Sequence, residues 1–199
     1  NTGGMGCVTP IPFADTNFMQ KVEEKIIVPT IQGLQKENLT YNGFIFFGLM
    51  NNNGNPFVIE YNCRLGDPET EVVLPRLKTD LLTLFTVMYN NTLADTTIEY
   101  HEGSFATIMA VSGGYPQEYE KNKKIIGLEK MEKNIATHIF HAGTKFDAEG
   151  NILTNGGRVL TVTAQATTLH EAVQKSKSAL DTVSFEGMYF RKDIGYEFF

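Results

Sequence analysis

The residues best suited to chemistry lie in one stretch, Glu60-Tyr61-Asn62-Cys63-Arg64-Leu65-Gly66-Asp67-Pro68-Glu69. Side chains alternate along a strand, so Glu60 and Asn62 put two oxygen ligands on one strand face. Hard cations such as Mg²⁺ take oxygen ligands, usually one or two carboxylates together with substrate phosphates and water. The planar, charged guanidinium of Arg64 suits a phosphate or a carboxylate. The stretch therefore predicts a site for a metal, a polyphosphate and an anionic substrate, with a structural ion pair at a strand end as the alternative.

Two glycine-rich segments are weaker candidates for anion binding. In Asn1-Thr2-Gly3-Gly4-Met5-Gly6, the glycines would let a phosphate approach backbone N–H groups. The segment lacks the GK[ST] ending of a P-loop and does not follow a strand as GxGxxG, so a plain flexible turn is the alternative. Asn155-Gly156-Gly157-Arg158 predicts a tight turn that aims Arg158 at an anion, or a turn with a surface arginine.

The elements around these residues follow from periodicity and capping signals. A helix is expected from Asp15 or Thr16 onward, kinked or split at Pro29. Strands at 43–50 and 57–62, joined by a loop at 51–55, predict a hairpin that carries Glu60 and Asn62. A helix after the hairpin would have Asp67 as its N-cap and Pro68 as its first residue, and another would begin at Thr79 or Asp80.

The second half of the chain has a different pattern. Strands are expected at 105–111, 137–142 and 158–166, followed by a helix that Thr167 or Thr168 caps and that ends near Val183. The polar segment 90–97 reads as a connector. We therefore expect an α+β protein with two domains, residues 1–100 and 101–199.

Composition limits the class of protein. The 199 residues include 17 Lys+Arg and 23 Asp+Glu, a net charge of −6, which argues against a broadly basic nucleic-acid-binding protein. No apolar run reaches the roughly 18 residues of a membrane helix, so no membrane partner is expected. Cys7 and Cys63 form no CxxC pair and predict reduced thiols in a cytoplasmic protein. The chain opens in a glycine-rich motif without Met, so we expect a piece of a longer chain.

Taken in order, these motifs resemble those of the glycinamide ribonucleotide synthetase (phosphoribosylamine–glycine ligase) family. The resemblance covers nearly the whole chain and extends beyond the stretches already quoted. The further motifs are Tyr41-Asn42-Gly43-Phe44, Gly48-Leu49-Met50, Ser112-Gly113-Gly114-Tyr115-Pro116, His141-Ala142-Gly143-Thr144 and Arg191-Lys192-Asp193-Ile194-Gly195-Tyr196.

The resemblance implies the second half of an ATP-grasp domain, followed by a small C-terminal α+β domain of strands and one main helix. It implies an ATP-dependent carbon–nitrogen ligase of purine biosynthesis that joins glycine to 5-phosphoribosylamine through an acyl phosphate and releases ADP and phosphate. Its partners would be ATP, glycine and 5-phosphoribosylamine, with a homodimer also expected from apolar surface left exposed.

The resemblance also assigns roles to individual residues. Glu60 and Asn62 match the ligands of Mg²⁺ or Mn²⁺, and Arg64 matches a catalytic arginine beside the phosphates and the substrate. Leu49 and Met50 match a nucleotide contact. The matched substrate-binding residues are Asn1, Thr2, Gly3, Gly4, Arg64 and Asp67.

Some features depart from the family pattern. Cys7 and Leu65 stand where Ala and Phe are expected, which are changes of packing size. The segments expected to supply the first half of the ATP-grasp fold are not in this sequence, so the isolated chain should be a poor or inactive catalyst. Two alternatives stay open: a non-catalytic binding module that retains the fold, and an ATP-grasp ligase with a different amine acceptor.

Overall fold

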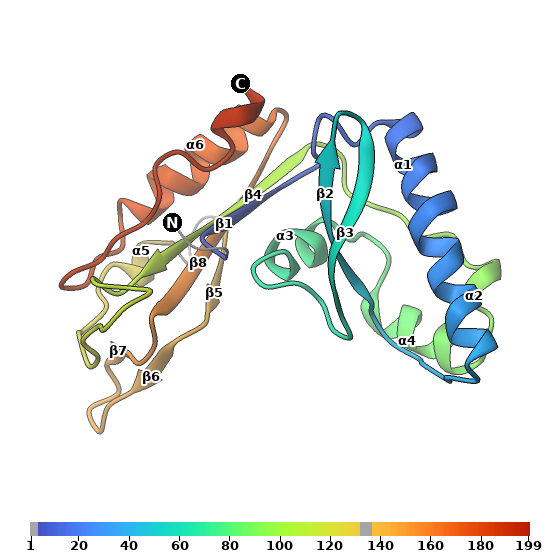
Figure 1. The fold of residues 1–199 in the computed structure, drawn as a ribbon. Helices are drawn as coiled ribbons and strands as arrows, with labels where there is room; N and C mark the ends of the chain where they lie inside the picture. The colour runs from blue at the N-terminus through green and yellow to red at the C-terminus, as the bar shows by residue number, and fades with distance from the viewer. Residues whose placement is uncertain (1–3, 132–136) are drawn as a thin grey trace. The chain divides into compact units, whose positions relative to one another are not determined.

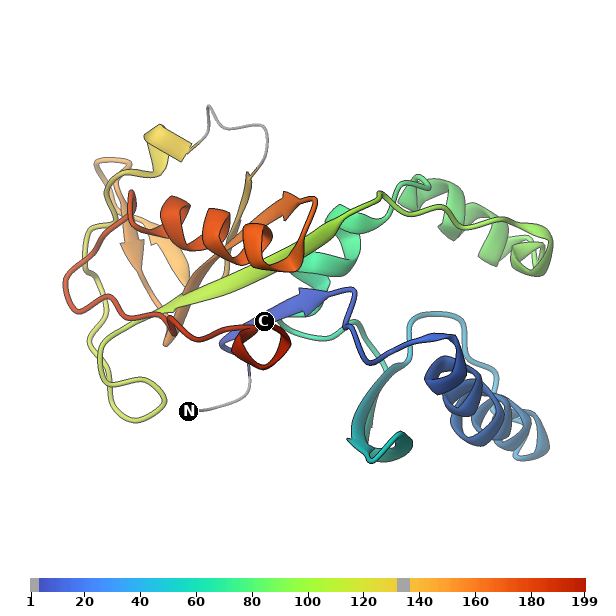
Figure 2. The same cartoon turned by 90° about the horizontal axis from the view of Figure 1, so that it is seen from above.

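The computed structural model describes residues 4–131 and 137–199, which contacts divide into two compact units (Figures 1 and 2). The sheet unit contains residues 1–10, 67–78 and 100–199, and the hairpin unit contains residues 11–66 and 79–99. The predicted domains, 1–100 and 101–199, do not coincide with these units. Residues 4–10 and 67–78 pack with the C-terminal half of the chain instead.

The hairpin unit begins with a long helical segment. It comprises α1 (Thr16–Val22), the π-helical turn η1 (Glu23–Ile27) and α2 (Val28–Lys36). Asp15 caps α1 by accepting a hydrogen bond from the backbone N–H of Phe18, as predicted. Where a kink or split at Pro29 was expected, the backbone stays helical through the π turn. Pro29 is one of the first two residues of α2 and follows directly after the π turn.

The central element of this unit is the antiparallel pair β2 (Phe46–Asn52) and β3 (Asn55–Asn62). Its turn residues, Asn53 and Gly54, both have positive φ, 51° and 76°, which suits the two-residue turn of a twisted hairpin. The Phe47 and Tyr61 rings meet edge to face at 5.3 Å, and the Tyr61 hydroxyl lies 3.3 Å from that of Thr30. This face of the hairpin is therefore anchored to α2. Helix α4 (Leu81–Tyr89), capped by Asp80, and the short η2 (Leu93–Asp95) complete the unit.

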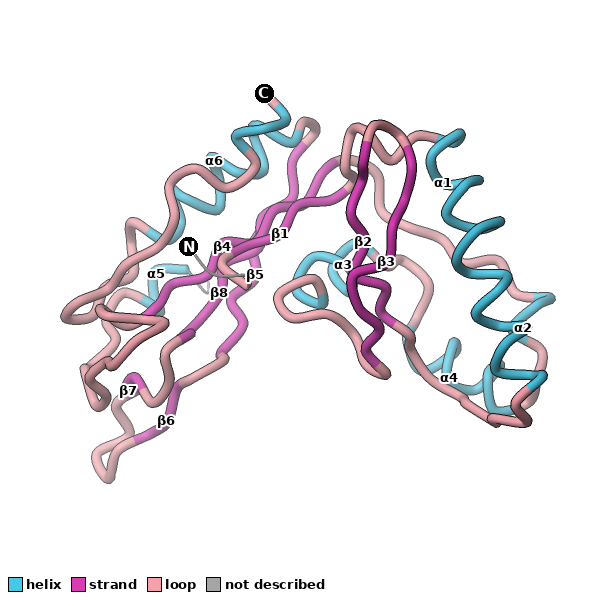
Figure 3. Tube along the Cα trace, viewed as in Figure 1, coloured by secondary structure: helices cyan, strands magenta, loops and turns pink. Residues whose placement is uncertain are grey.

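The sheet unit is built on four antiparallel strands in the order β1-β4-β8-β5 (magenta in Figure 3). These are β1 (Gly6–Thr9), β4 (Ser104–Val111), β8 (Arg158–Ala166) and β5 (Thr137–His141). The other elements are α3 (Thr70–Arg76), α5 (Leu128–Met131), the pair β6 (Thr144–Phe146) and β7 (Ile152–Thr154), α6 (Leu169–Leu180) and η3 (Tyr196–Phe198).

The core of the sheet unit lies on both faces of β4, all eight residues of which are buried. Helix α6 packs on one face, where Ala106 and Ile108 meet Ala172 and Val173. The alternating side chains of β4 and β8 lie on the opposite face, where part of them contact α3 and where Met109 and Val111 pack with Met5. There, the Thr163 hydroxyl donates to the backbone carbonyl of Glu71, which ties α3 to the sheet.

Helix α6 begins with a capping box. The Thr168 side chain accepts from the backbone N–H of Glu171, and the Glu171 carboxylate accepts from the backbone N–H of Thr168. Its four buried residues, Ala172, Val173, Ser176 and Leu180, form one face toward the sheet. Within residues 4–131 and 137–199, no helix combines the length and apolar character needed to cross a membrane.

Candidate metal and phosphate site

Glu60, Asn62 and Arg64 come together at the end of β3. The Asn62 side-chain amide donates to Glu60 Oε1 at 3.0 Å, and the Arg64 guanidinium donates to Asn62 Oδ1 at 3.3 Å. A second guanidinium nitrogen of Arg64 donates to the backbone carbonyl of Leu65 at 2.9 Å. Glu60 and Arg64 are exposed and Asn62 is half-buried. The structure thus groups the three side chains chosen from the sequence and leaves them accessible.

The position of Glu60 depends on an irregularity in the hairpin. Glu60 pairs with Gly48 and Asn62 with Phe46, whereas the next pair toward the turn is Leu49 with Val58. Ile59 therefore has no partner on β2 and forms a β-bulge. Bulges bend a strand and redirect its side chains, so strict alternation holds only from Glu60 to Asn62.

The oxygen donors of Glu60 and Asn62 suit a hard cation whose coordination shell a bound ligand completes. Glu60 supplies carboxylate oxygens and Asn62 an amide oxygen, the atoms that Mg²⁺ and Mn²⁺ accept. In the part of the chain that the structure describes, no group of three or more His, Cys, Asp or Glu side chains could enclose a metal ion. Phosphate oxygens and water would have to fill the remaining positions, with Arg64 nearby to offset phosphate charge.

Asp67 is part of a different contact, within the sheet unit. Its carboxylate pairs with the Arg158 guanidinium at 2.5 Å. Arg158 also donates to the backbone carbonyls of Asp67 and Gly4, at 3.3 and 3.5 Å. The prediction that Asp67 is an N-cap is wrong, because Arg158 takes its carboxylate and Glu69 precedes α3 without a side-chain capping bond. Arg158, for which the sequence suggested either an anion or a surface position, thus faces the carboxylate of Asp67.

The structure gives the positions of the other predicted ligand-binding residues, but these positions do not test the predicted roles. Leu49 and Met50 lie on β2 opposite Val58 and Phe57, and Met50 is 56% exposed. Gly4 has a φ of 80° and lies against Arg158. Asn1, Thr2 and Gly3 lie outside the described residues. The substrate and nucleotide contacts of these residues stay predictions.

Two ionisable groups near the start of α3 have raised pKa values. Burial raises the pKa of the Cys7 thiol to about 12, and the negative charges of Glu69 and Glu71 contribute to the rise. Burial also raises the pKa of Glu71, reinforced by Asp67 and opposed by Arg158. The Glu71 Oε2 atom is buried without a hydrogen-bond partner among the described residues. A thiol held protonated in this way is a packing group and not a nucleophile.

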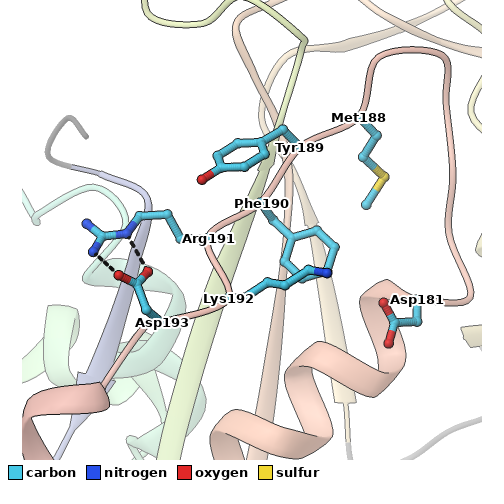
Figure 4. Close-up of a pocket in the computed structure, with 7 residues that line it drawn as sticks. All are labelled: Asp181, Met188, Tyr189, Phe190, Arg191, Lys192 and Asp193. Carbon is cyan, nitrogen blue, oxygen red and sulfur yellow. Dashed lines mark hydrogen bonds and ion pairs between the residues drawn. The ribbon is translucent and has the colours of Figure 1, made fainter.

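An open pocket of about 550 Å³ lies at the C-terminal segment of the sheet unit (Figure 4). The Arg191 guanidinium faces Asp193 there, with two hydrogen bonds of 2.7 Å each. Asp193 therefore offsets the positive charge of this guanidinium within the pocket. The residues that line it are Asp181, Met188, Tyr189, Phe190, Arg191, Lys192 and Asp193, and none of them was chosen from the sequence as a ligand-binding residue.

The fold of this chain resembles that of a biotin carboxylase domain. The biotin carboxylase domain of the Hydrogenobacter thermophilus 2-oxoglutarate carboxylase superimposes with a TM-score of 0.61 at 15% identity, over 93% of this chain and 40% of that one. That protein was crystallised as a dimer with ADP, magnesium ADP and bicarbonate. At this identity the likeness shows the fold alone.

Sequence comparisons specify the family. The models for the phosphoribosylglycinamide synthetase ATP-grasp (A) domain and C domain match residues 1–70 and 105–197. The phosphoribosylamine–glycine ligase of Chlorobaculum tepidum is 44% identical over 98% of this chain, and that of Thermotoga maritima superimposes with a TM-score of 0.83 at 34% identity. The chain belongs to the phosphoribosylglycinamide synthetase family and corresponds to its C-terminal portion.

The match covers only part of the relatives. The chain spans 46% of the length of the Chlorobaculum tepidum protein and 46% of the Thermotoga maritima chain. In the trifunctional purine biosynthetic protein adenosine-3 of Gallus gallus, 41% identical, the matched region is 19% of the length.

Proposed function

We propose that this chain forms the part of a phosphoribosylamine–glycine ligase that holds the metal and the phosphates of ATP. The complete enzyme would join glycine to 5-phosphoribosylamine and release glycinamide ribonucleotide, ADP and phosphate. The observation that carries the proposal is the contiguous set of Glu60, Asn62 and Arg64 on an accessible strand end. The names of the relatives support the choice of substrates.

The reaction would take place in two displacements. A glycine carboxylate oxygen attacks the γ-phosphorus of ATP while the bond to ADP breaks, which gives an acyl phosphate. The amine nitrogen of phosphoribosylamine then attacks the acyl carbon, the bond to phosphate breaks, and the nitrogen loses a proton. Such chemistry needs positioning and neutralisation of charge, not a side-chain nucleophile.

Each residue of the set has a distinct task in this proposal. Glu60 and Asn62 would hold Mg²⁺ or Mn²⁺, which when bound offsets the charge of the phosphate oxygens. Arg64 would place its guanidinium beside the phosphates and the acyl phosphate. Asp67, Gly4 and the first three residues would bind substrate, and Leu49 and Met50 would contact the nucleotide.

Two further properties belong to the same proposal. The free thiols Cys7 and Cys63 support a cytoplasmic location, because such thiols persist in a reducing compartment. Exposed apolar side chains of the hairpin, such as Met50, Phe57 and Ile59, support a homodimer or a further contact of that surface.

The test is ADP formation by a full-length ligase that carries this sequence. We expect repeated turnover to ADP only when both glycine and phosphoribosylamine are present, and Glu60→Gln to lower turnover by about 100-fold or more. Glu37→Gln, at an exposed helix end of the same unit, is the matched control and should leave turnover unchanged. ADP formation with another amine but not with phosphoribosylamine would identify a different ligase. Undiminished turnover in Glu60→Gln would refute the assignment of the site.

A further inference from the structure

Gly48 lies directly opposite Glu60, at the last regular pair before the β-bulge. A Cβ atom added at Gly48 would be 2.9 Å from Glu60 Cγ, with the Glu60 backbone oxygen and nitrogen next, at 3.6 and 3.7 Å. Non-bonded carbon atoms pack at about 3.5–4.0 Å, so a methyl group at this position would collide with the middle of the Glu60 side chain. The space that Glu60 fills therefore exists because residue 48 has no side chain.

The hairpin has little freedom to relieve such a collision. On one side of Glu60, Tyr61 is held by the Phe47 ring and by the Thr30 hydroxyl. On the face of Glu60 itself, its Oε1 atom is fixed by the amide of Asn62 at 3.0 Å. The clash involves Cγ, close to the backbone, so rotating only the carboxylate would not remove it. Glu60 would have to change χ1 and leave Asn62.

We propose that Gly48 is a positioning residue, which sets the side-chain direction of Glu60 and so holds its carboxylate beside Asn62. The inference rests on the proposed function in one respect: it takes Glu60 to be a metal ligand. Gly48 itself contributes no donor. Its role is to leave free the space that Glu60 Cγ occupies when the carboxylate lies beside Asn62. A larger residue would leave all three site residues present but separate Glu60 from the other two.

A double-mutant cycle in the full-length ligase tests this role. The variants are Gly48→Ala, Glu60→Ala and the pair, and the readout is the Mg²⁺ concentration for half-maximal ATP binding. We expect Gly48→Ala to raise that concentration by about 10-fold or more, as loss of a ligand-orienting group does. In the Glu60→Ala background the same change should have no further effect. Gly33→Ala is the matched control, since an added Cβ there meets nothing within 4 Å.

Melting temperatures keep the test decisive if Gly48→Ala folds poorly. They are measured for the natural protein, the two single variants and the double variant. Gly48→Ala should lower the melting temperature when Glu60 is present and should not lower it in the Glu60→Ala protein, where Cγ is gone. Equal losses in both backgrounds, or a folded Gly48→Ala protein with wild-type Mg²⁺ dependence, would overturn the inference. If Glu60→Ala itself leaves the Mg²⁺ dependence unchanged, the metal-ligand proposal fails, while the melting cycle still decides whether Gly48 positions Glu60.

Discussion

The thiol of Cys7 gives a sharp test of how β1 packs in the sheet unit. Burial raises its pKa from the ordinary 9.0 to about 12, with Glu69 and Glu71 contributing. A thiolate is the reacting species of cysteine, and each unit of pKa is a tenfold change in its population. A difference of 12 − 9.0, about three units, lowers the thiolate fraction near neutral pH by about 1,000-fold.

The assay is a time course of alkylation by iodoacetamide at pH 7.5, read by mass spectrometry for each cysteine. Cys63 is exposed and serves as the internal reference. Because Cys7 as a residue is only partly buried, we expect its alkylation to be at least about 100-fold slower than that of Cys63. In denaturant the two rates should become similar. Equal rates in the folded protein would refute the packing of β1 against β4 near α3.

The same group predicts a dependence of stability on pH. The folded protein keeps the Cys7 proton at pH values where the unfolded chain loses it, because the pKa is raised on folding. Stability should therefore fall as pH rises from about 9 to about 12. Cys7→Ala should flatten that fall in urea titrations at several pH values, and an unchanged slope would contradict the raised pKa.

Three further variants test the sheet unit. Arg158→Ala removes the ion pair with Asp67, in which the Arg158 and Asp67 side chains are 27% and 52% exposed. It should lower the free energy of unfolding in urea by about 1–2 kcal/mol. An unchanged free energy would mean that this ion pair does not stabilise the sheet unit. Glu71→Gln removes a carboxylate whose pKa burial raises, so it should increase stability at pH 7 by less than about 1 kcal/mol, with the gain vanishing toward pH 4. A gain of equal size at both pH values would point to packing instead of charge. Thr168→Ala breaks the capping box of α6 and should cost about 1 kcal/mol in thermal unfolding, and no loss would show that the cap is dispensable.

The local features of the fold could be predicted because their causes lie within a few residues. Asn53 and Gly54 tolerate the left-handed backbone that the hairpin turn requires. The caps at Asp15, Asp80 and Thr168 each bond a backbone N–H three residues ahead. The same locality explains why Glu60, Asn62 and Arg64 could be grouped from the sequence. Glu60 and Asn62 lie on one strand and Arg64 follows two residues later, so their proximity does not depend on distant residues.

The features that were missed depend on distant residues. β1 is four residues long and pairs with β4 a hundred positions later, so its sequence alone reads as a glycine-rich loop. Asp67 was read as a helix cap because its true partner, Arg158, is 91 positions away. The bulge at Ile59 follows from the register between β2 and β3. Gly48 could have been found from the sequence, because pairing the two predicted strands places this glycine opposite the predicted ligand Glu60.

The central claim is that Glu60 and Asn62 hold the metal that accompanies ATP, and calorimetry on the full-length ligase tests it directly. ATP binding should be measured with and without Mg²⁺ in the natural protein and in a Glu60→Ala, Asn62→Ala double variant. We predict that Mg²⁺ strengthens ATP binding in the natural protein and has little effect on the double variant. An equal gain from Mg²⁺ in both proteins would contradict the account.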